Sequence, residues 1–161
     1  MDRFGYNLTG NVSEGKRKPV LVYVDSRTLE NKTDYTVELG TTYRDVISIE
    51  LVKAVVPNPS DDDYLVLQVT NVNVNNVSNS PLLGNALCTL ERTSAVASPL
   101  VYKRNNSEHN IAYMTYLDQP IKLSKLKIKF RRPDDSTPDF GIDNHLLVFE
   151  INTLNQPVVP F

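Results

Sequence analysis

Residues 22–58 read VYVDSRTLENKTDYTVELGTTYRDVISIELVKAVVPN, and the spacing of apolar residues in this stretch decides the fold. In residues 34–39 and 45–51, Tyr, Val, Ile and Leu alternate with Thr, Glu, Ser and Asp. A two-residue period is typical of a strand with one buried and one solvated face. The stretch therefore predicts consecutive short strands at residues 22–27, 34–39 and 45–51, which together build a sheet.

The rest of the chain continues this pattern. Further strands are predicted at residues 64–70, 72–77, 86–92, 100–103, 111–117, 125–130 and 145–151. Clusters of Pro, Asn, Asp and Ser separate them, and no window of 11 residues sustains the apolar spacing of a helix. The sequence predicts an all-β domain with about eight to nine strands, arranged as a jelly roll or as an immunoglobulin-like sandwich.

Four short patterns inside residues 22–58 occur in a fixed order: Val-Asp-Ser-Arg at 24–27, Tyr-x-Val-x-Leu at 35–39, Val-x-Ser-Ile-Glu-Leu at 46–51, and Pro57-Asn58. In this combination the chain resembles the small single jelly-roll capsid proteins, of penton or minor capsid type, of large icosahedral nucleocytoplasmic DNA viruses. The resemblance returns in the last two predicted strands. It implies a single jelly-roll β-sandwich and a role in shell assembly, either at the vertex or as a minor component that binds the lattice of major capsid protein.

Length and composition fit one such domain. The chain has 161 residues, of which 40% are hydrophobic and 22% charged, values that are ordinary for a soluble globular protein. The strand pattern divides it into an N-terminal tail (1–18), a jelly-roll domain (19–154) and a C-terminal tail (155–161). No apolar run approaches the roughly 20 residues of a membrane-spanning helix.

The residues that enzymes and metal sites commonly use are sparse. Cys88 is the only cysteine and is expected to be a buried, inert thiol. His109 and His145 lie far apart, without Cys or paired carboxylates at the spacing of a zinc site. The chain also lacks a Gly-x-Ser-x-Gly elbow and a glycine-rich phosphate loop. We therefore expect no enzymatic activity, no cofactor and no metal.

Partner contacts are the function that the resemblance implies. The candidate contact residues are basic residues of one predicted strand, acidic residues of one loop, and apolar residues of the C-terminal tail: Lys125, Lys127, Lys129, Arg131, Asp61, Asp62, Asp63, Val158, Val159 and Phe161. The basic strand could equally be a solvated outer face whose lysines discourage unwanted edge pairing. The apolar tail could equally pack against its own domain.

The expected partners are copies of the chain and the major capsid protein. A net charge of −2 and a pI of about 5.7 disfavour nucleic acid, and membrane contact is also disfavoured. The N-terminus has no secretory signal pattern, so we expect synthesis in the host cytoplasm and a final location in the virion. The alternative is a carbohydrate- or receptor-binding β-sandwich on a virion fibre or attachment device, which the absence of Trp weakens.

Overall fold

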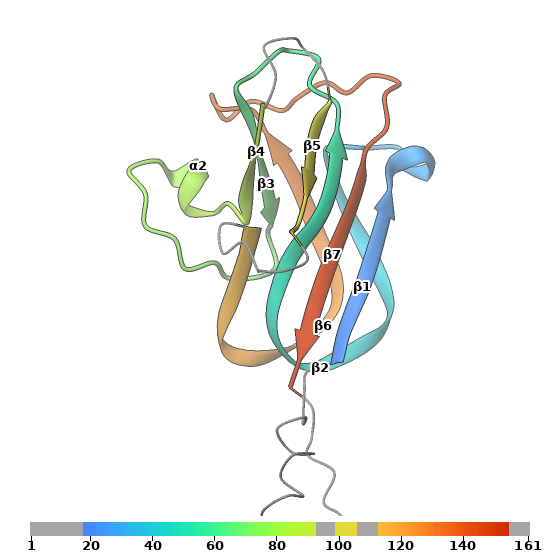
Figure 1. The fold of residues 1–161 in the computed structure, drawn as a ribbon, viewed down its shortest axis with the longest axis vertical. Coiled ribbons are helices and arrows are strands. Elements are labelled where there is room, and N and C mark those ends of the chain that lie inside the picture. The colour runs from blue at the N-terminus through green and yellow to red at the C-terminus, as the bar shows by residue number, and fades with distance from the viewer. Residues whose placement is uncertain (1–17, 93–98, 106–112, 155–161) are drawn as a thin grey trace, which may run out of the picture.

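The computed structural model describes residues 18–92, 99–105 and 113–154, and its secondary structure is mainly antiparallel β-strand, with 57% strand and 7% helix. The strands form one curled sheet, a half-barrel (Figure 1). In chain order the elements are β1 (Lys18–Asp25), the 3-10 helix η1 (Ser26–Thr28), β2 (Asp34–Val56), β3 (Tyr64–Val69), α2 (Pro81–Gly84), β4 (Cys88–Glu91), β5 (Leu100–Lys103), β6 (Met114–Arg131) and β7 (Leu146–Thr153). The all-β prediction is confirmed.

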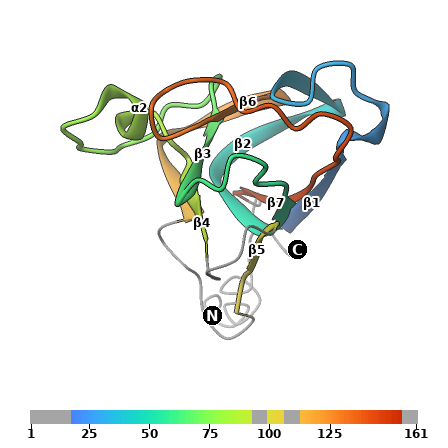
Figure 2. The same cartoon turned by 90° about the horizontal axis from the view of Figure 1, so that it is seen from above.

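The sheet has seven strands in the order β1-β7-β2-β6-β3-β4, with β5 paired to β2 beside this path. β2 and β6 are 23 and 18 residues long, and both bend and contribute to both halves of the sheet. The first part of β2 pairs with the last part of β6, whereas the last part of β2 pairs with β7 and β5. Figure 2 looks down the resulting curl, in which the two halves face each other across the core.

The bends explain why the structure has fewer strands than predicted. The strands predicted at 34–39 and 45–51 are one strand, and those predicted at 111–117 and 125–130 join within β6. The β2–β6 pairing shifts register three times between Glu38 and Ser48. Gly40, with φ +79°, takes a left-handed conformation that a side chain would strain. The shifts and this glycine let the strand turn a corner without ending.

Two further predictions about strands are wrong. The segment 72–77 alternates Val with Asn but is irregular, because β3 already pairs with β6 on one edge and β4 on the other. The chain also leaves β1 after Asp25, whose side chain accepts a hydrogen bond from the backbone N–H of Arg27 and starts η1.

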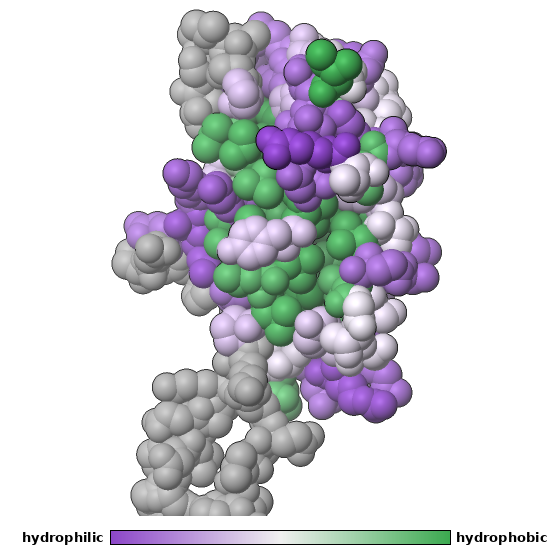
Figure 3. All heavy atoms as spheres, turned by 90° about the vertical axis from the view of Figure 1, so that its right-hand side faces the viewer, coloured by the Kyte–Doolittle hydropathy of each residue, from purple (hydrophilic) through white to green (hydrophobic). Residues whose placement is uncertain are grey.

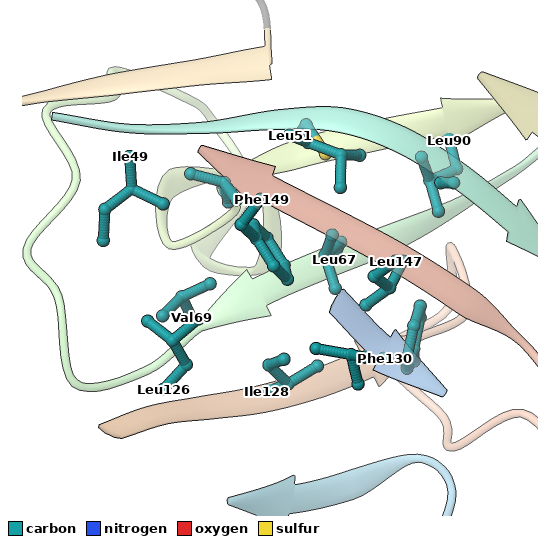
Figure 4. Close-up of a cluster of buried hydrophobic side chains, with 14 of the residues drawn as sticks. Ile49, Leu51, Leu67, Val69, Leu90, Leu126, Ile128, Phe130, Leu147 and Phe149 are labelled. Atoms are coloured by element: carbon teal, nitrogen blue, oxygen red, sulfur yellow. The ribbon is translucent and has the colours of Figure 1, made fainter. Parts of the chain in front are cut away.

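The core lies inside the curl and takes side chains from both halves. Leu126, Ile128 and Phe130 point inward from β6, and Leu147, Phe149 and Ile151 point inward from β7 (Figure 4). In β6 this matches the alternation of apolar and basic residues in the sequence. In β2, however, Val46 joins Ile49 in the core while Ile47 is half-buried, because the register shift between Val46 and Ser48 changes which residues face inward.

A smaller cluster lies on the opposite side of β3. Val66 points outward and is covered by Leu82 of α2 and by Ala86. The connection between β3 and β4 therefore covers the outer face of this half of the sheet. Cys88, at the start of β4, is buried as predicted, and burial raises the pKa of its thiol.

Candidate functional site

One outer face of the sheet carries apolar side chains on four adjacent strands, with the charged residues Asp25, Lys53 and Lys103 in the same registered rows. It carries side chains that point away from the core in β1, β7, β2 and β5: Leu21, Tyr23, Leu146, Val148, Val55 and Val101. We call this set the apolar outer face. Leu21, Tyr23 and Val101 are 49%, 68% and 49% exposed. Figure 3 shows a hydrophobic area on the side of the molecule that carries β1.

The residues of the apolar outer face are in direct register. Tyr23 lies opposite Val148, and Leu146 lies opposite Val55. Val55 in turn lies opposite Val101 of β5. This face was not predicted from the sequence. A signal was present, however, because residues 20–24 and 146–149 are apolar on both parities. Such a pattern is typical of strands that are covered on both sides.

Beside the apolar outer face, the β2–β7 pair carries a buried polar ladder. Ser48 lies opposite Asn152, which donates a hydrogen bond to the Ser48 hydroxyl at 3.0 Å. Glu50 lies opposite Glu150, and Nη1 of Arg104 is 3.0 Å and 3.1 Å from one carboxylate oxygen of each. The Glu50 side chain is 0% exposed. The guanidinium therefore bridges one glutamate of β2 and one of β7 on the outer face of the sheet.

The electrostatics of this ladder favour a charged arginine. Burial by itself lowers the pKa of Arg104, but the hydrogen bonds and charges of Glu150 and Glu50 raise that pKa above its ordinary value. Strand alternation predicts that the two glutamates are solvated, since they alternate with core residues. Their burial therefore had no signal in the sequence.

The basic strand has the geometry that the sequence predicts. Lys125 and Lys127 are exposed, Lys129 and Arg131 are half-buried, and the residues between them are buried. Its charge is partly balanced by acidic residues of β2: Glu38 lies opposite Lys125, Asp34 lies opposite Lys129, and Arg131 is 3.8 Å from Asp34.

The acidic loop is held by arginines of its own chain. Arg132 donates to both carboxylate oxygens of Asp62, at 3.0 Å and 3.2 Å. Arg92 pairs with Asp61 and, at 3.0 Å, with Asp63. These ion pairs tie the loop after β2 to the ends of β4 and β6. Val158, Val159 and Phe161, the remaining contact candidates, lie outside the described residues.

His145 lies in an aromatic cage directly before β7. It stacks on Tyr35 and meets the edges of Phe130 and, at a tilt, Phe140. Its Nε2 is 2.6 Å from the Tyr35 hydroxyl, and Nδ1 is buried without a hydrogen-bond partner in the described part of the chain. Burial, and next the charge of Lys32, lower the pKa of His145 to about 4, although Asp25 opposes this shift.

This cage predicts acid sensitivity. The unfolded chain binds a proton at His145 below pH about 6.5, whereas the folded chain resists it until about pH 4, so stability is full above the first value and falls as the pH drops between the two. From pH 7.5 to pH 5 the histidine should cost about 2 kcal/mol of unfolding free energy. Urea unfolding of the wild type and His145→Gln at both pH values measures the difference. An equal pH dependence in the two proteins would contradict the assignment.

No protein-family model matches the chain, and no curated protein matches it at a significant level. Among the described residues, no helix is both long and apolar enough to span a membrane. In the same part of the chain, no three His, Cys, Asp or Glu side chains group closely enough to hold a metal ion.

Proposed function

We propose that the protein is a structural component of the capsid of a large icosahedral DNA virus, either its vertex protein or a minor capsid protein. It would act by contact with neighbouring subunits rather than by catalysis. The observation that carries the proposal is the apolar outer face, which adds to the sequence resemblance within residues 22–58. Leu21, Tyr23 and Val101 on this face are about half exposed or more, and exposed apolar side chains that gather on one face are typical of protein contacts.

A jelly-roll arrangement is part of this proposal, and the strand order supports it. If β2 and β6 are each divided at their bends, one layer contains β1, β7, the last part of β2, and then β5 followed by the first part of β6 along one edge. The other layer contains the first part of β2, the last part of β6, β3 and β4. Two facing layers linked in this crossed order are characteristic of a jelly roll.

The proposed occupant of the apolar outer face is another capsid subunit. Stable contacts between subunits commonly bury about 2,000 Å² or more, with an apolar centre and a polar rim. The apolar outer face supplies apolar side chains for such a centre on four adjacent strands, and Asp25, Lys53 and Lys103 lie in the same rows, where they could form polar contacts. The charged residues of the basic strand and the acidic loop lie on other parts of the surface. There they would contribute to specificity for one neighbouring subunit over another.

The mass of the purified protein in solution tests the proposal. Light scattering over a range of concentrations should give a pentamer if the chain is the vertex protein. A monomer should instead bind the purified major capsid protein encoded in the same genome, which indicates the minor capsid role. A monomer that does not bind that protein at any concentration would overturn the proposal.

Charge on the apolar outer face should prevent this association. The double variant Leu21→Glu, Tyr23→Glu places two carboxylates where a neighbour would bury them without partners. We expect the dissociation constant of the complex to rise at least tenfold, which corresponds to about 1.4 kcal/mol. Val77→Glu, at a fully exposed position of the β3–β4 connection, is the matched control. Unchanged association of the double variant would show that the contact lies elsewhere.

A further inference from the structure

A second surface has chemistry unlike that of the apolar outer face. A groove of about 360 Å³ lies between the irregular segment after β3 and the bend of β6. We call it the amide groove, and its polar lining consists of Asn71, Asn73, Asn75, Tyr116, Asp118 and Gln119. Half-buried apolar residues of the same two segments line the rest of it.

The wall that carries Asn73 and Asn75 is pinned at both ends. At one end, Asn71 donates to the carbonyl of Lys125 and accepts from the N–H of Lys127, both at 2.9 Å. At the other end, Asn76 donates to the carbonyl of Ala86 at 2.7 Å and to that of Leu83 at 3.1 Å. Asn73 and Asn75 lie between these anchors. The groove is therefore preformed, which reduces the entropy that a ligand would lose on binding.

Apart from Asn71, which bonds the backbone of β6, the amide and carboxylate side chains of the amide groove are not used by the fold. Within the part of the chain that the structure describes, the side chains of Asn73, Asn75, Asp118 and Gln119 form no hydrogen bond or ion pair, and Asn73, Asn75, Asp118 and Gln119 are exposed. Each amide offers both donors and an acceptor, and the carboxylate offers acceptors. Alternating donors and acceptors match neighbouring hydroxyl groups, each of which donates one hydrogen bond and accepts others.

The charge and the aromatic ring narrow the ligand class. Among the residues that the structure describes, no lysine or arginine lines the groove, so a phosphate, sulfate or carboxylate ligand would find no counter-charge from this part of the chain and would be repelled by Asp118. Tyr116 lines the groove and is 56% exposed. An exposed tyrosine offers an apolar ring face together with a polar hydroxyl, which suits a ligand that has both C–H and O–H groups.

We propose that the amide groove binds neutral sugar residues of an oligosaccharide. Tyr116 contacts the apolar face of a sugar ring, Asp118 accepts hydrogen bonds from its hydroxyl groups, and the three amides that the fold does not use complete the contacts. This activity is separate from subunit association, because the amide groove and the apolar outer face share no residue. The same chain could therefore hold a place in a shell and carry a sugar-binding surface.

A glycan array with labelled full-length protein is the first test, and it should include neutral, sialylated and sulfated oligosaccharides. We expect saturable binding to neutral glycans, which calorimetric titration with the best neutral oligosaccharide then quantifies. Tyr116→Ala and Asp118→Ala should each weaken that binding at least tenfold. Tyr116→Phe, which keeps the ring, should retain most of it, and Glu30→Ala, which removes an exposed acidic residue elsewhere, should leave it unchanged.

Other results of these experiments would contradict the proposed sugar binding. An array without binding to neutral glycans overturns the proposal, and so does a preference for the anionic ones. Neutral binding that survives both alanine variants would place the sugar site elsewhere on the chain. Thermal melting of each variant separates a lost contact from a lost fold, since the three substituted side chains are exposed and their replacement should leave the melting temperature nearly unchanged.

Discussion

Replacement of Phe149 by alanine should lower the free energy of unfolding by about 3–5 kcal/mol. Phe149 is fully buried in β7, the strand between β1 and β2, and in Figure 4 it lies between side chains of both halves of the sheet. Removal of its ring loses apolar burial and also leaves a cavity, because strands held in register on both edges cannot close around the space. Urea unfolding followed by circular dichroism measures the loss.

Two further variants separate cavity formation from a general effect of substitution. Phe149→Leu keeps most of the volume and should cost about 1 kcal/mol. Ile142→Ala removes a side chain of similar size from a position that is 92% exposed, and its effect should stay within about 0.5 kcal/mol. If Phe149→Ala were as mild as Ile142→Ala, the two halves of the sheet would not meet over this ring.

The part of the fold that sequence predicts well is the part governed by local alternation. Lys125 to Arg131 alternates basic and apolar residues, and the structure places Leu126, Ile128 and Phe130 inside with the basic residues outside. A strand with one buried face leaves this pattern because each residue reverses direction. Alternation does not identify the core side of β7, because residues 146–149 are apolar on both parities. Predicting the buried face of β6 from alternation requires no knowledge of which strands are its neighbours.

The alternation of apolar and polar residues does not show which strands pair with each other. The turn residues around Gly40 look like the end of a strand, yet β2 continues through them because β6 follows the same bend. Conversely, residues 72–77 have strand-like alternation but follow β3, both of whose edges are already paired. Whether a segment becomes a strand thus depended on partners far away in sequence, which is tertiary context.

The candidate contacts illustrate the same limit. Asp61, Asp62 and Asp63 look like a solvated acidic loop until Arg132, 70 residues after Asp62, is folded beside it. The apolar outer face has a sequence signal in the uninterrupted apolar runs, but only the register shows that Tyr23, Val148 and Val55 belong to one surface. Long-range ion pairs and shared faces are properties of the pairing, not of any segment.

The second large loss of stability is expected at the buried polar ladder. Replacing Arg104 by methionine should lower the free energy of unfolding by about 3 kcal/mol. Methionine fills a comparable volume but removes the guanidinium that bridges Glu50 and Glu150, which lie directly opposite each other on β2 and β7. Two like charges across neighbouring strands destabilise a sheet, and burial strengthens their repulsion because little water screens it.

A rescue experiment separates this electrostatic cause from lost packing. In the triple variant Arg104→Met, Glu50→Gln, Glu150→Gln, the shapes remain similar but the two negative charges are gone. If the charge bridge is the cause, the triple variant should regain most of the stability that Arg104→Met loses, and the three sites should be strongly non-additive in denaturant unfolding. If the losses instead add, Arg104 contributes through packing of its alkyl chain. Recovery would establish that charge neutralisation across β2 and β7, beside the apolar outer face, stabilises the sheet at the surface proposed for subunit contact.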